Sequence, residues 1–147
     1  MSTAPPALPG TPADLGSRLI ARLVDGLVIL FVVVPLVLAG ILPEEGTAGA
    51  VAVVAMSFVY SAVLDAGGGT LGKRLLRLTV TGPDGRRPGL GPGATRNLWL
   101  LTSLFPGLVG QATATAVSIV LAISIAKHPT ELGWHDRVAG TAVRRPA

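Results

Sequence analysis

The sequence predicts an all-α membrane protein, a helical bundle of three to four transmembrane segments that carries a small cytoplasmic β-hairpin or three-stranded cap. Composition is the first reason, because the 147 residues are 50% hydrophobic and only 14% charged, whereas soluble proteins are about 25% charged. A soluble domain of this size has too much surface to cover with so few charges. The second reason is the clustering of apolar residues in four segments, at about 20–42, 48–66, 95–105 and 107–126.

Residues 1–12 are expected to form a disordered tail, and residues 13–147 a single membrane domain. The first ten residues are rich in proline and uncharged, a composition that buries too little apolar surface to fold. Thr11 is a candidate N-cap for the first helix, with Pro12 at the first helical position, and Ser17 is the alternative cap.

The first apolar segment is long enough to cross a membrane. From Leu23 to Leu42 it contains about twenty residues, the number that spans a bilayer core, and its one charge is Asp25. The apolar side chains favour insertion by roughly 7 kcal/mol, whereas one aspartate costs at most about 3 kcal/mol. Asp25 is therefore carried into the membrane.

Three ionisable residues share one face of this first helix. Arg18, Arg22 and Asp25 follow one another at intervals of four and three residues, the spacing of neighbours on a helix surface. We expect this intramembrane ionic cluster to contain an ion pair between Asp25 and either Arg22 or Arg18. Two interpretations stay open: a structural pair that anchors the helix end, and a site that binds a cation or a proton.

The second apolar segment follows a tight acidic turn, so residues 17–66 are expected to form a helical hairpin. Residues 67–92 are polar and basic, and the alternation of apolar side chains from 75 to 81 indicates a strand. A turn at 82–85 then leads to a candidate second strand at 86–90.

Residues 97–126 carry no charge, and Pro106-Gly107 divides them. The first part is expected to be a short re-entrant or shallow helix, and the second part is long enough to span. In the tail, Val138–Val143 has the composition to pair with Leu75–Thr81, and a third strand would stabilise an otherwise marginal hairpin.

A second set of candidate site residues is expected at the cytoplasmic interface. These are charged or titratable side chains at the membrane edge, in the polar excursion and in the tail: Asp65, Lys73, Arg74, Arg96, His135 and Asp136.

Several site chemistries are excluded by the residues present. The chain has no cysteine, which excludes disulfides and thiolate chemistry. Gly67-x4-Gly72-Lys73 resembles a P-loop, but Arg74 stands where that motif needs Ser or Thr. The spacing of the potential metal ligands fits no known site closely; these are His128, Glu131, His135 and Asp136. We therefore expect no enzymatic activity, no metal and no cofactor, and the low aromatic content of 4% argues against nucleic acid.

The sequence contains four short pieces in this order: RLIARLVD from Arg18, TLGKRLLRLTVTGPDGRRP from Thr70, the arginine of ATRN, and GWHDRVAGTAV from Gly133. Together they resemble the RDD family of small bacterial integral membrane proteins, which is named for one arginine and two aspartates. The resemblance implies a polytopic membrane domain in which Arg18 and Asp25 are the family's arginine and first aspartate, with Arg22 as an extra cation. It maps the second aspartate onto Asp136, with Asp65 as the rival.

The distribution of basic residues predicts sidedness. All twelve Lys and Arg residues lie near the N-terminal flank, within 73–96, or in the tail. Basic flanks stay inside, so we expect a multi-pass protein of the bacterial plasma membrane with both termini cytoplasmic, in which residues 95–126 enter the membrane and return.

Two functions remain open at this point. The first is a small ion- or proton-coupled transporter that works as an oligomer, transport being the usual suggestion for the family. The second is a non-catalytic membrane subunit or scaffold that docks a partner through its basic cytoplasmic face. The expected partners are the lipid bilayer, with anionic lipid at the basic face, and either a second copy or a partner membrane protein.

Overall fold

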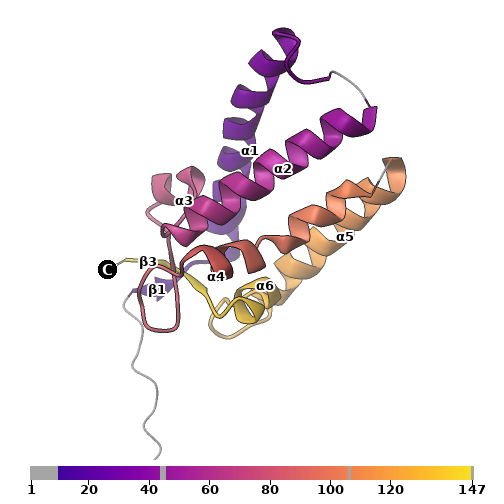
Figure 1. The fold of residues 1–147 in the computed structure, drawn as a ribbon. Coiled ribbons are helices and arrows are strands. Elements are labelled where there is room, and N and C mark those ends of the chain that lie inside the picture. Colours follow the sequence, from indigo (N-terminus) through magenta and orange to yellow (C-terminus); the bar gives the residue numbers. More distant parts are fainter. Residues whose placement is uncertain (1–9, 44–45, 106, 147) are drawn as a thin grey trace, which may run out of the picture.

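Three long helices dominate the computed structural model, which describes residues 10–43, 46–105 and 107–146. They are α1 (Leu15–Leu38), α2 (Gly46–Ala66) and α5 (Gly107–Ala126), and each is long and apolar enough to cross a membrane. In Figure 1 they extend from one end of the molecule, where a small sheet and several short helices gather. The predicted fold class, a membrane helical bundle with a small β cap, is confirmed.

A short strand precedes the first helix. Thr11 and Pro12 form β1, so they belong to the folded domain and not to the predicted tail, whose other residues up to Pro9 lie outside the described part of the chain. The N-cap of α1 is Asp14, whose carboxylate accepts a hydrogen bond from the Ser17 backbone N–H at 2.8 Å. A short acidic side chain can reach the free amides of a first helical turn. The two predicted caps, Thr11 and Ser17, are therefore wrong.

The polar excursion begins as a helix and not as a strand. Helix α3 (Leu71–Leu75) follows α2, and strand β2 is confined to Thr79–Thr81. The predicted strand at 75–81 is thus right only in its second half. Arg77 explains the late start, because its φ of 55° lies in the left-handed region and interrupts an extended chain.

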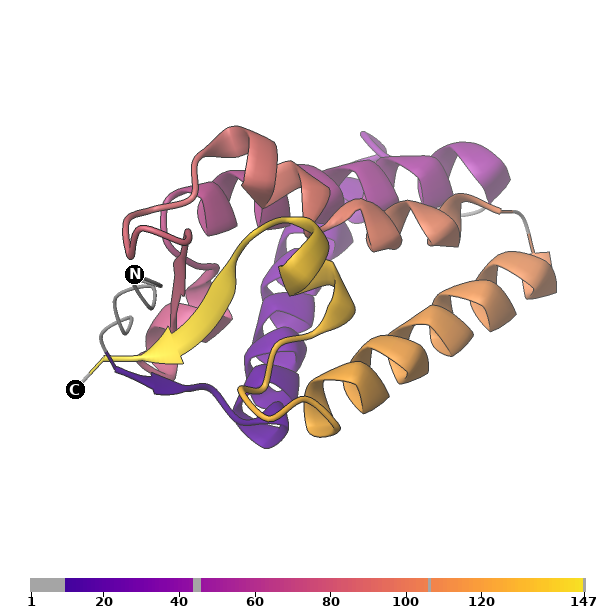
Figure 2. The ribbon, with the colours of Figure 1, turned by 90° about the horizontal axis from the view of Figure 1, so that it is seen from below.

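Two short helices connect the excursion to α5. They are α4 (Leu90–Thr95) and the 3-10 helix η1 (Leu98–Leu104), and the predicted strand at 86–90 is wrong. At 2.0 Å per residue the seven residues of η1 cover about 14 Å. Helix α5 then runs back beside η1, with which it is in contact (Figure 2). Residues 95–126 therefore run away from the sheet and return to it.

Three strands form one antiparallel sheet in the order β1-β3-β2. The central strand is β3 (Ala142–Arg145), in which Val143 lies opposite Val80 of β2 and Arg145 lies opposite Thr11 of β1. The predicted pairing between the tail and the excursion is confirmed only in part, because Ala142 and Val143 pair with β2 whereas Val138, the start of the predicted tail strand, ends α6. The third strand comes from the N-terminal segment. The buried cluster at the sheet includes Val80 of β2 and Val143 of β3, together with Ala13, Ala21 and Leu78.

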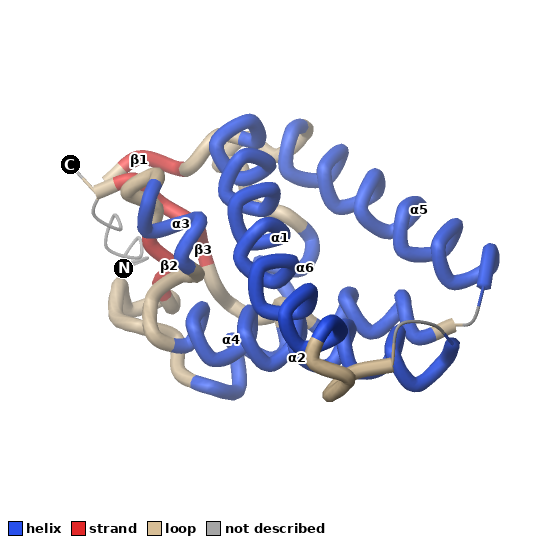
Figure 3. Tube along the Cα trace, turned by 90° about the horizontal axis from the view of Figure 1, so that it is seen from above, coloured by secondary structure: helices blue, strands red, loops and turns tan. Residues whose placement is uncertain are grey.

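The last short helix, α6 (Trp134–Val138), lies between α5 and β3 in the chain and contacts both. Figure 3 shows α1 between α3 on one side and α5 on the other, and α1 contacts each of them. We call the part of the molecule that holds the sheet, α3, α4 and α6 the sheet end. Every short element except η1 lies there, so segments far apart in the sequence meet around the first turns of α1.

Candidate functional site

Five charged side chains from different elements meet at the sheet end and form what we call the ionic network. Arg18 Nη1 of α1 lies 2.5 Å from Asp136 Oδ2 of α6, and Lys73 Nζ of α3 lies 2.6 Å from Asp65 Oδ1 of α2. Arg96, at the end of α4, joins the two pairs: its Nε lies 3.0 Å from Asp65 Oδ2 and its Nη2 lies 2.9 Å from Asp136 Oδ1. One guanidinium thus connects two carboxylates.

The ionic network is buried. Asp65 and Asp136 are 0% exposed and Arg96 is 3% exposed. Charges that leave water are tolerated only when they are paired and hydrogen-bonded further. Asn97 Nδ2 donates to Asp65 Oδ2 and the Gly133 N–H donates to Asp136 Oδ2, each at 3.1 Å. Both carboxylates are therefore held by cations and by neutral donors.

Neighbouring charges set the protonation of the network residues outside the spanning helices. Burial alone would raise the pKa of the Asp136 carboxyl, but Arg96, His135 and Arg18 lower it to about 2. Burial and the nearby Arg96 lower the pKa of Lys73 to about 8, against the opposing effect of the Asp65 carboxylate. Asp136 is consequently ionised at neutral pH, and Lys73 loses its proton under mildly alkaline conditions.

Asp25 is held by hydrogen bonds and not by an arginine. Its carboxylate accepts from Tyr60 Oη at 2.8 Å, from Thr70 Oγ1 at 2.6 Å and from the Gly72 backbone N–H at 2.8 Å. These donors come from α2 and from the start of α3, so Asp25 ties three elements together. The ion pair that the sequence predicts for Asp25 is wrong, because these three donors occupy its oxygens.

The two predicted partners of Asp25 point to other elements. Arg18 enters the ionic network. Arg22 Nη1 lies 3.3 Å from Ser61 Oγ, and its guanidinium lies over the ring of Trp99, 5.0 Å from the centroid. In the part of the chain that the structure describes, no ion pair involves Arg22.

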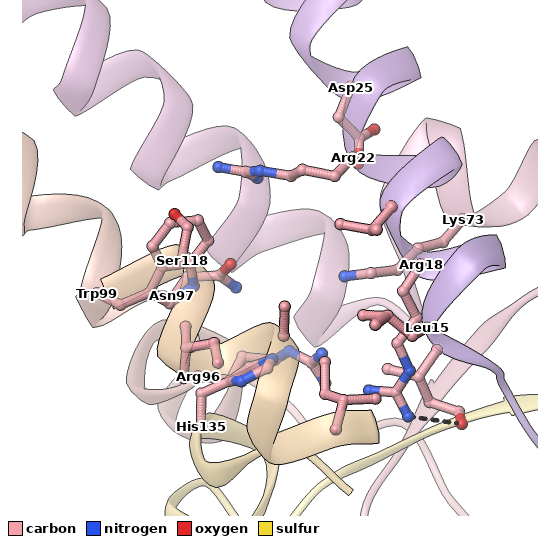
Figure 4. Close-up of a pocket in the computed structure, with 15 residues that line it drawn as sticks. Leu15, Arg18, Arg22, Asp25, Lys73, Arg96, Asn97, Trp99, Ser118 and His135 are labelled. Atoms are coloured by element: carbon pink, nitrogen blue, oxygen red, sulfur yellow. Dashed lines mark hydrogen bonds between the residues drawn. The ribbon is translucent and has the colours of Figure 1, made fainter. Parts of the chain in front are cut away.

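A cavity of about 170 Å³ lies beside Arg22, between α1, η1 and α5. Apolar side chains of α1 and α5 supply much of its wall. Its polar lining consists of Arg18, Arg22, Asp25, Lys73, Arg96, Asn97, Ser118 and His135. Figure 4 shows Arg22 reaching from α1 toward Trp99 and Ser118, on the opposite side from His135.

The cavity continues along α5 into a wider opening, which we call the groove. Arg22, Trp99 and Ser118 line both spaces. Going away from the sheet end, the groove adds Gln111 and Thr115 of α5. A path with polar side chains therefore leads from the ionic network along a membrane-spanning helix.

His135 borders the cavity as a neutral side chain. Its Nε2 lies 3.5 Å from Asp136 Oδ1, and its Nδ1 is buried without a hydrogen-bond partner. Burial lowers the pKa of His135 to about 4; Asp136 opposes this change, whereas Arg96, Arg18 and Lys73 add to it. Among the described residues, no group of three or more His, Asp or Glu side chains is arranged to hold a metal ion.

The sequence model of the RDD family matches residues 12–140. The chain belongs to the RDD family. In this RDD protein the arginine that carries the resemblance, Arg18, is paired directly with Asp136. Asp65, the other candidate for the second aspartate, lies in the same network, one guanidinium away. Comparisons of this RDD protein with curated proteins and with solved structures give no match.

The structure divides the interface residues predicted for this RDD protein into two groups. The ionic network contains Asp65, Lys73, Arg96 and Asp136, and His135 lies against it. Arg74 stays apart: it is exposed, and its Nε donates to the Gly69 carbonyl oxygen at 2.8 Å. Four of the six residues therefore hold this RDD protein together from inside and do not form an outer surface.

Uncharged residues of this site escaped the reasoning from sequence. They position Asp25, Asp65 and Arg22, and they are Tyr60, Ser61, Thr70, Asn97 and Trp99. Thr70 and Asn97 lie inside two of the pieces that carry the resemblance to the RDD family, TLGKR and ATRN. Their place in these pieces is the signal that would have identified Thr70 and Asn97.

Proposed function

We propose that this RDD protein is a multi-pass protein of the bacterial plasma membrane that transports a small ion, with or without proton coupling, as an oligomer. The observation that carries the proposal is the charged cavity of about 170 Å³ between α1, η1 and α5, which continues into the groove. Ionisable side chains that gather around a cavity between membrane-spanning helices are typical of ion pathways. The proposal includes no enzymatic step.

The proposal places the sheet end and both termini in the cytoplasm. The strands β1, β2 and β3 come from the N-terminal segment, the excursion and the tail, and they share one sheet. Basic segments remain in the cytoplasm. Six exposed arginines at the sheet end support this orientation: Arg74, Arg77, Arg86, Arg87, Arg137 and Arg145.

The oligomer is proposed because one copy leaves polar groups of a spanning helix uncovered. Gln111, Thr115 and Ser118 on α5 are exposed, and α1 and α5 diverge from the sheet end in Figure 1. Helix interfaces in membranes favour small and hydroxylated residues, since these allow close packing and hydrogen bonds. A second copy seated against α5 would close the groove on its open side.

Flux measurements in liposomes test the transport proposal. The purified protein is reconstituted and exposed to ion and pH gradients, and Ala122→Leu is compared with Ala116→Leu. Ala122 lines the cavity and the groove, whereas Ala116 is exposed on α5 and lines neither. We expect ion flux in the native protein and in Ala116→Leu, and its loss in Ala122→Leu. Equal flux in the two variants, or none in the native protein, would reject the proposal.

A docking subunit or scaffold is the second candidate, and the exposed arginines of the excursion favour it. Arg86 and Arg87 lie on the exposed turn between β2 and α4, where they can meet anionic lipid or an acidic partner. Charge reversal of both residues is expected to weaken binding to anionic vesicles while ion flux persists. Full retention of vesicle binding would remove the support for this candidate.

A further inference from the structure

Arg22 is the one cation lining the cavity that has no carboxylate partner among the described residues. The other three, Arg18, Lys73 and Arg96, belong to the ionic network. Asp25 lies on the same helix face, but three other donors take its oxygens. Arg22 keeps one long hydrogen bond, of 3.3 Å, to a serine hydroxyl.

The cavity therefore carries an excess of positive charge. Its four cations are balanced by three carboxylates, those of Asp25, Asp65 and Asp136. Of these three carboxylates only Asp25 lines the cavity, whereas Asp65 and Asp136 belong to the ionic network. A half-buried guanidinium between apolar helices is costly without a counter-charge. Asp25, the one carboxylate among the lining residues, is hydrogen-bonded to other donors, so Arg22 has no hydrogen-bonded counter-charge there.

We propose that the cavity binds a small oxyanion of the phosphate class against Arg22. A guanidinium presents a planar fork of N–H groups that matches two oxygens of such an anion. Trp99 covers the face of the Arg22 guanidinium, which leaves the edge of the fork as the donor surface. Ser118 on α5 lines the cavity on that side, and its hydroxyl donates to the Ala114 carbonyl oxygen at 2.7 Å (Figure 4).

Apolar side chains reinforce the attraction between the anion and Arg22. Leu121 and Ile125 of α5 are buried and line the same cavity, and electrostatic attraction is stronger where water is excluded. Binding of the oxyanion in the cavity does not depend on transport, whereas the oxyanion as the transported substrate rests on the proposed function.

Two sources can present this chemistry. Inorganic phosphate can enter from the sheet end, and the phosphate head of an anionic lipid can enter sideways through the groove. The first source predicts a response to dissolved phosphate in discs of neutral lipid. The second predicts a response only when phosphatidylglycerol replaces the neutral lipid.

Trp99 provides a local reporter for the test. The chain has two tryptophans, so Trp134→Phe leaves Trp99 as the only one, 5.0 Å from the Arg22 guanidinium. The full-length protein is placed in phosphatidylcholine nanodiscs and titrated with inorganic phosphate. A second series contains phosphatidylglycerol and no dissolved phosphate. We expect a saturable change of Trp99 emission in one of the two series.

Variants of Arg22 decide whether the response belongs to the proposed site. Arg22→Gln is expected to raise the concentration at half-saturation about tenfold or more. Arg22→Lys should raise this concentration less, because the charge remains although the fork is lost. Arg137→Gln, an exposed arginine on α6 that lines neither space, should respond like the native protein. An unchanged response in Arg22→Gln, or none in either lipid series, would overturn the inference.

A further variant guards against misfolding and separates the two proposals. Ala122→Leu fills the cavity while leaving every charge in place, so it should lose the Trp99 response that Ala116→Leu keeps; equal responses would overturn the inference. Phosphate binding that depends on Arg22 without any flux would support the inference and reject transport. Flux that is insensitive to Arg22→Gln, without phosphate binding, would overturn the inference and support transport.

Discussion

At the scale of single residues, Arg96 is the side chain on which the ionic network depends most. It contacts both fully buried carboxylates, Asp65 and Asp136, and its Nη1 lies 3.1 Å from Thr141 Oγ1. Arg96→Gln leaves two buried anions with one cation each, so we expect a loss of about 3 kcal/mol in the free energy of unfolding. Denaturant titration of the detergent-solubilised protein measures this loss. Arg137→Gln, an exposed arginine, should change stability by less than about 0.5 kcal/mol.

His135 gives the stability a defined pH dependence. Burial and the charges of Arg96, Arg18 and Lys73 lower its pKa from 6.5 to about 4, against the opposing effect of Asp136. Between these two pH values the unfolded chain binds a proton at this position and the folded chain does not. Stability should therefore fall as the pH drops from 6.5 to 4, by up to about 3 kcal/mol in total.

The control for this pH dependence is His135→Gln, which removes the titrating group. Its free energy of unfolding should change less with pH than that of the native protein between pH 6.5 and 4. Asp136 contributes at lower pH, because its pKa of about 2 lies below the window. Parallel pH profiles for the two proteins would contradict the assignment to His135.

The sequence identified most charged residues of the site but not their partners. Helical spacing reports neighbours on one helix, so it suggested Asp25 as the partner of Arg18 or Arg22. The true partner of Arg18 is Asp136, 118 residues away, and no local pattern encodes that pairing. The donors to Asp25, such as Tyr60, are uncharged, so no pattern of charged residues in the sequence indicated them.

At the scale of elements, glycines set how closely the short helices approach the spanning ones. A Cβ on Gly93 of α4 would lie 2.5 Å from the Ala62 carbonyl oxygen and 2.9 Å from the Ala66 nitrogen of α2. Gly93→Ala must push α4 off α2 and is expected to cost about 2 kcal/mol. Thermal unfolding measures the change.

Gly91, two residues earlier in α4, is the matched control for this substitution. A Cβ there meets nothing within 4 Å. Gly91→Ala should therefore be neutral or stabilise by about 0.5 kcal/mol, since alanine is the better helix former. Equal effects of the two substitutions would show that the contact between α4 and α2 does not limit stability.

The long helices were predictable from sequence, and the short elements largely were not. Insertion into a bilayer requires about twenty apolar residues in a row, a strong signal that α1, α2 and α5 all carry. Strands of two to four residues contain too few positions to show a period. The limits of β2 depend instead on the left-handed backbone of Arg77.

At the scale of the whole molecule, the sheet makes sidedness testable with few probes. The chain has no cysteine, so single substitutions can be labelled cleanly. Arg86→Cys and Arg137→Cys at the exposed sheet end should react only from the cytoplasmic side. Thr47→Cys, exposed in the first turn of α2, should react only from outside. Labelling of both sheet-end probes from outside would mean that the proposed orientation is inverted, and labelling of the two probes from opposite sides would contradict the shared sheet.

The pairing of Arg18 with Asp136 also bears on how the chain is made. Synthesis at about 5–20 residues per second puts roughly 6–24 s between these two residues, which are 118 positions apart. During that interval Arg18 lacks its carboxylate partner, and β1 and β2 lack the central strand that joins them. A ribosome that stops before Gly133 would release a chain with both defects. Such a chain is expected to be recognised and degraded by membrane proteases. Only a chain whose C-terminal segment has been made can therefore form the complete ionic network.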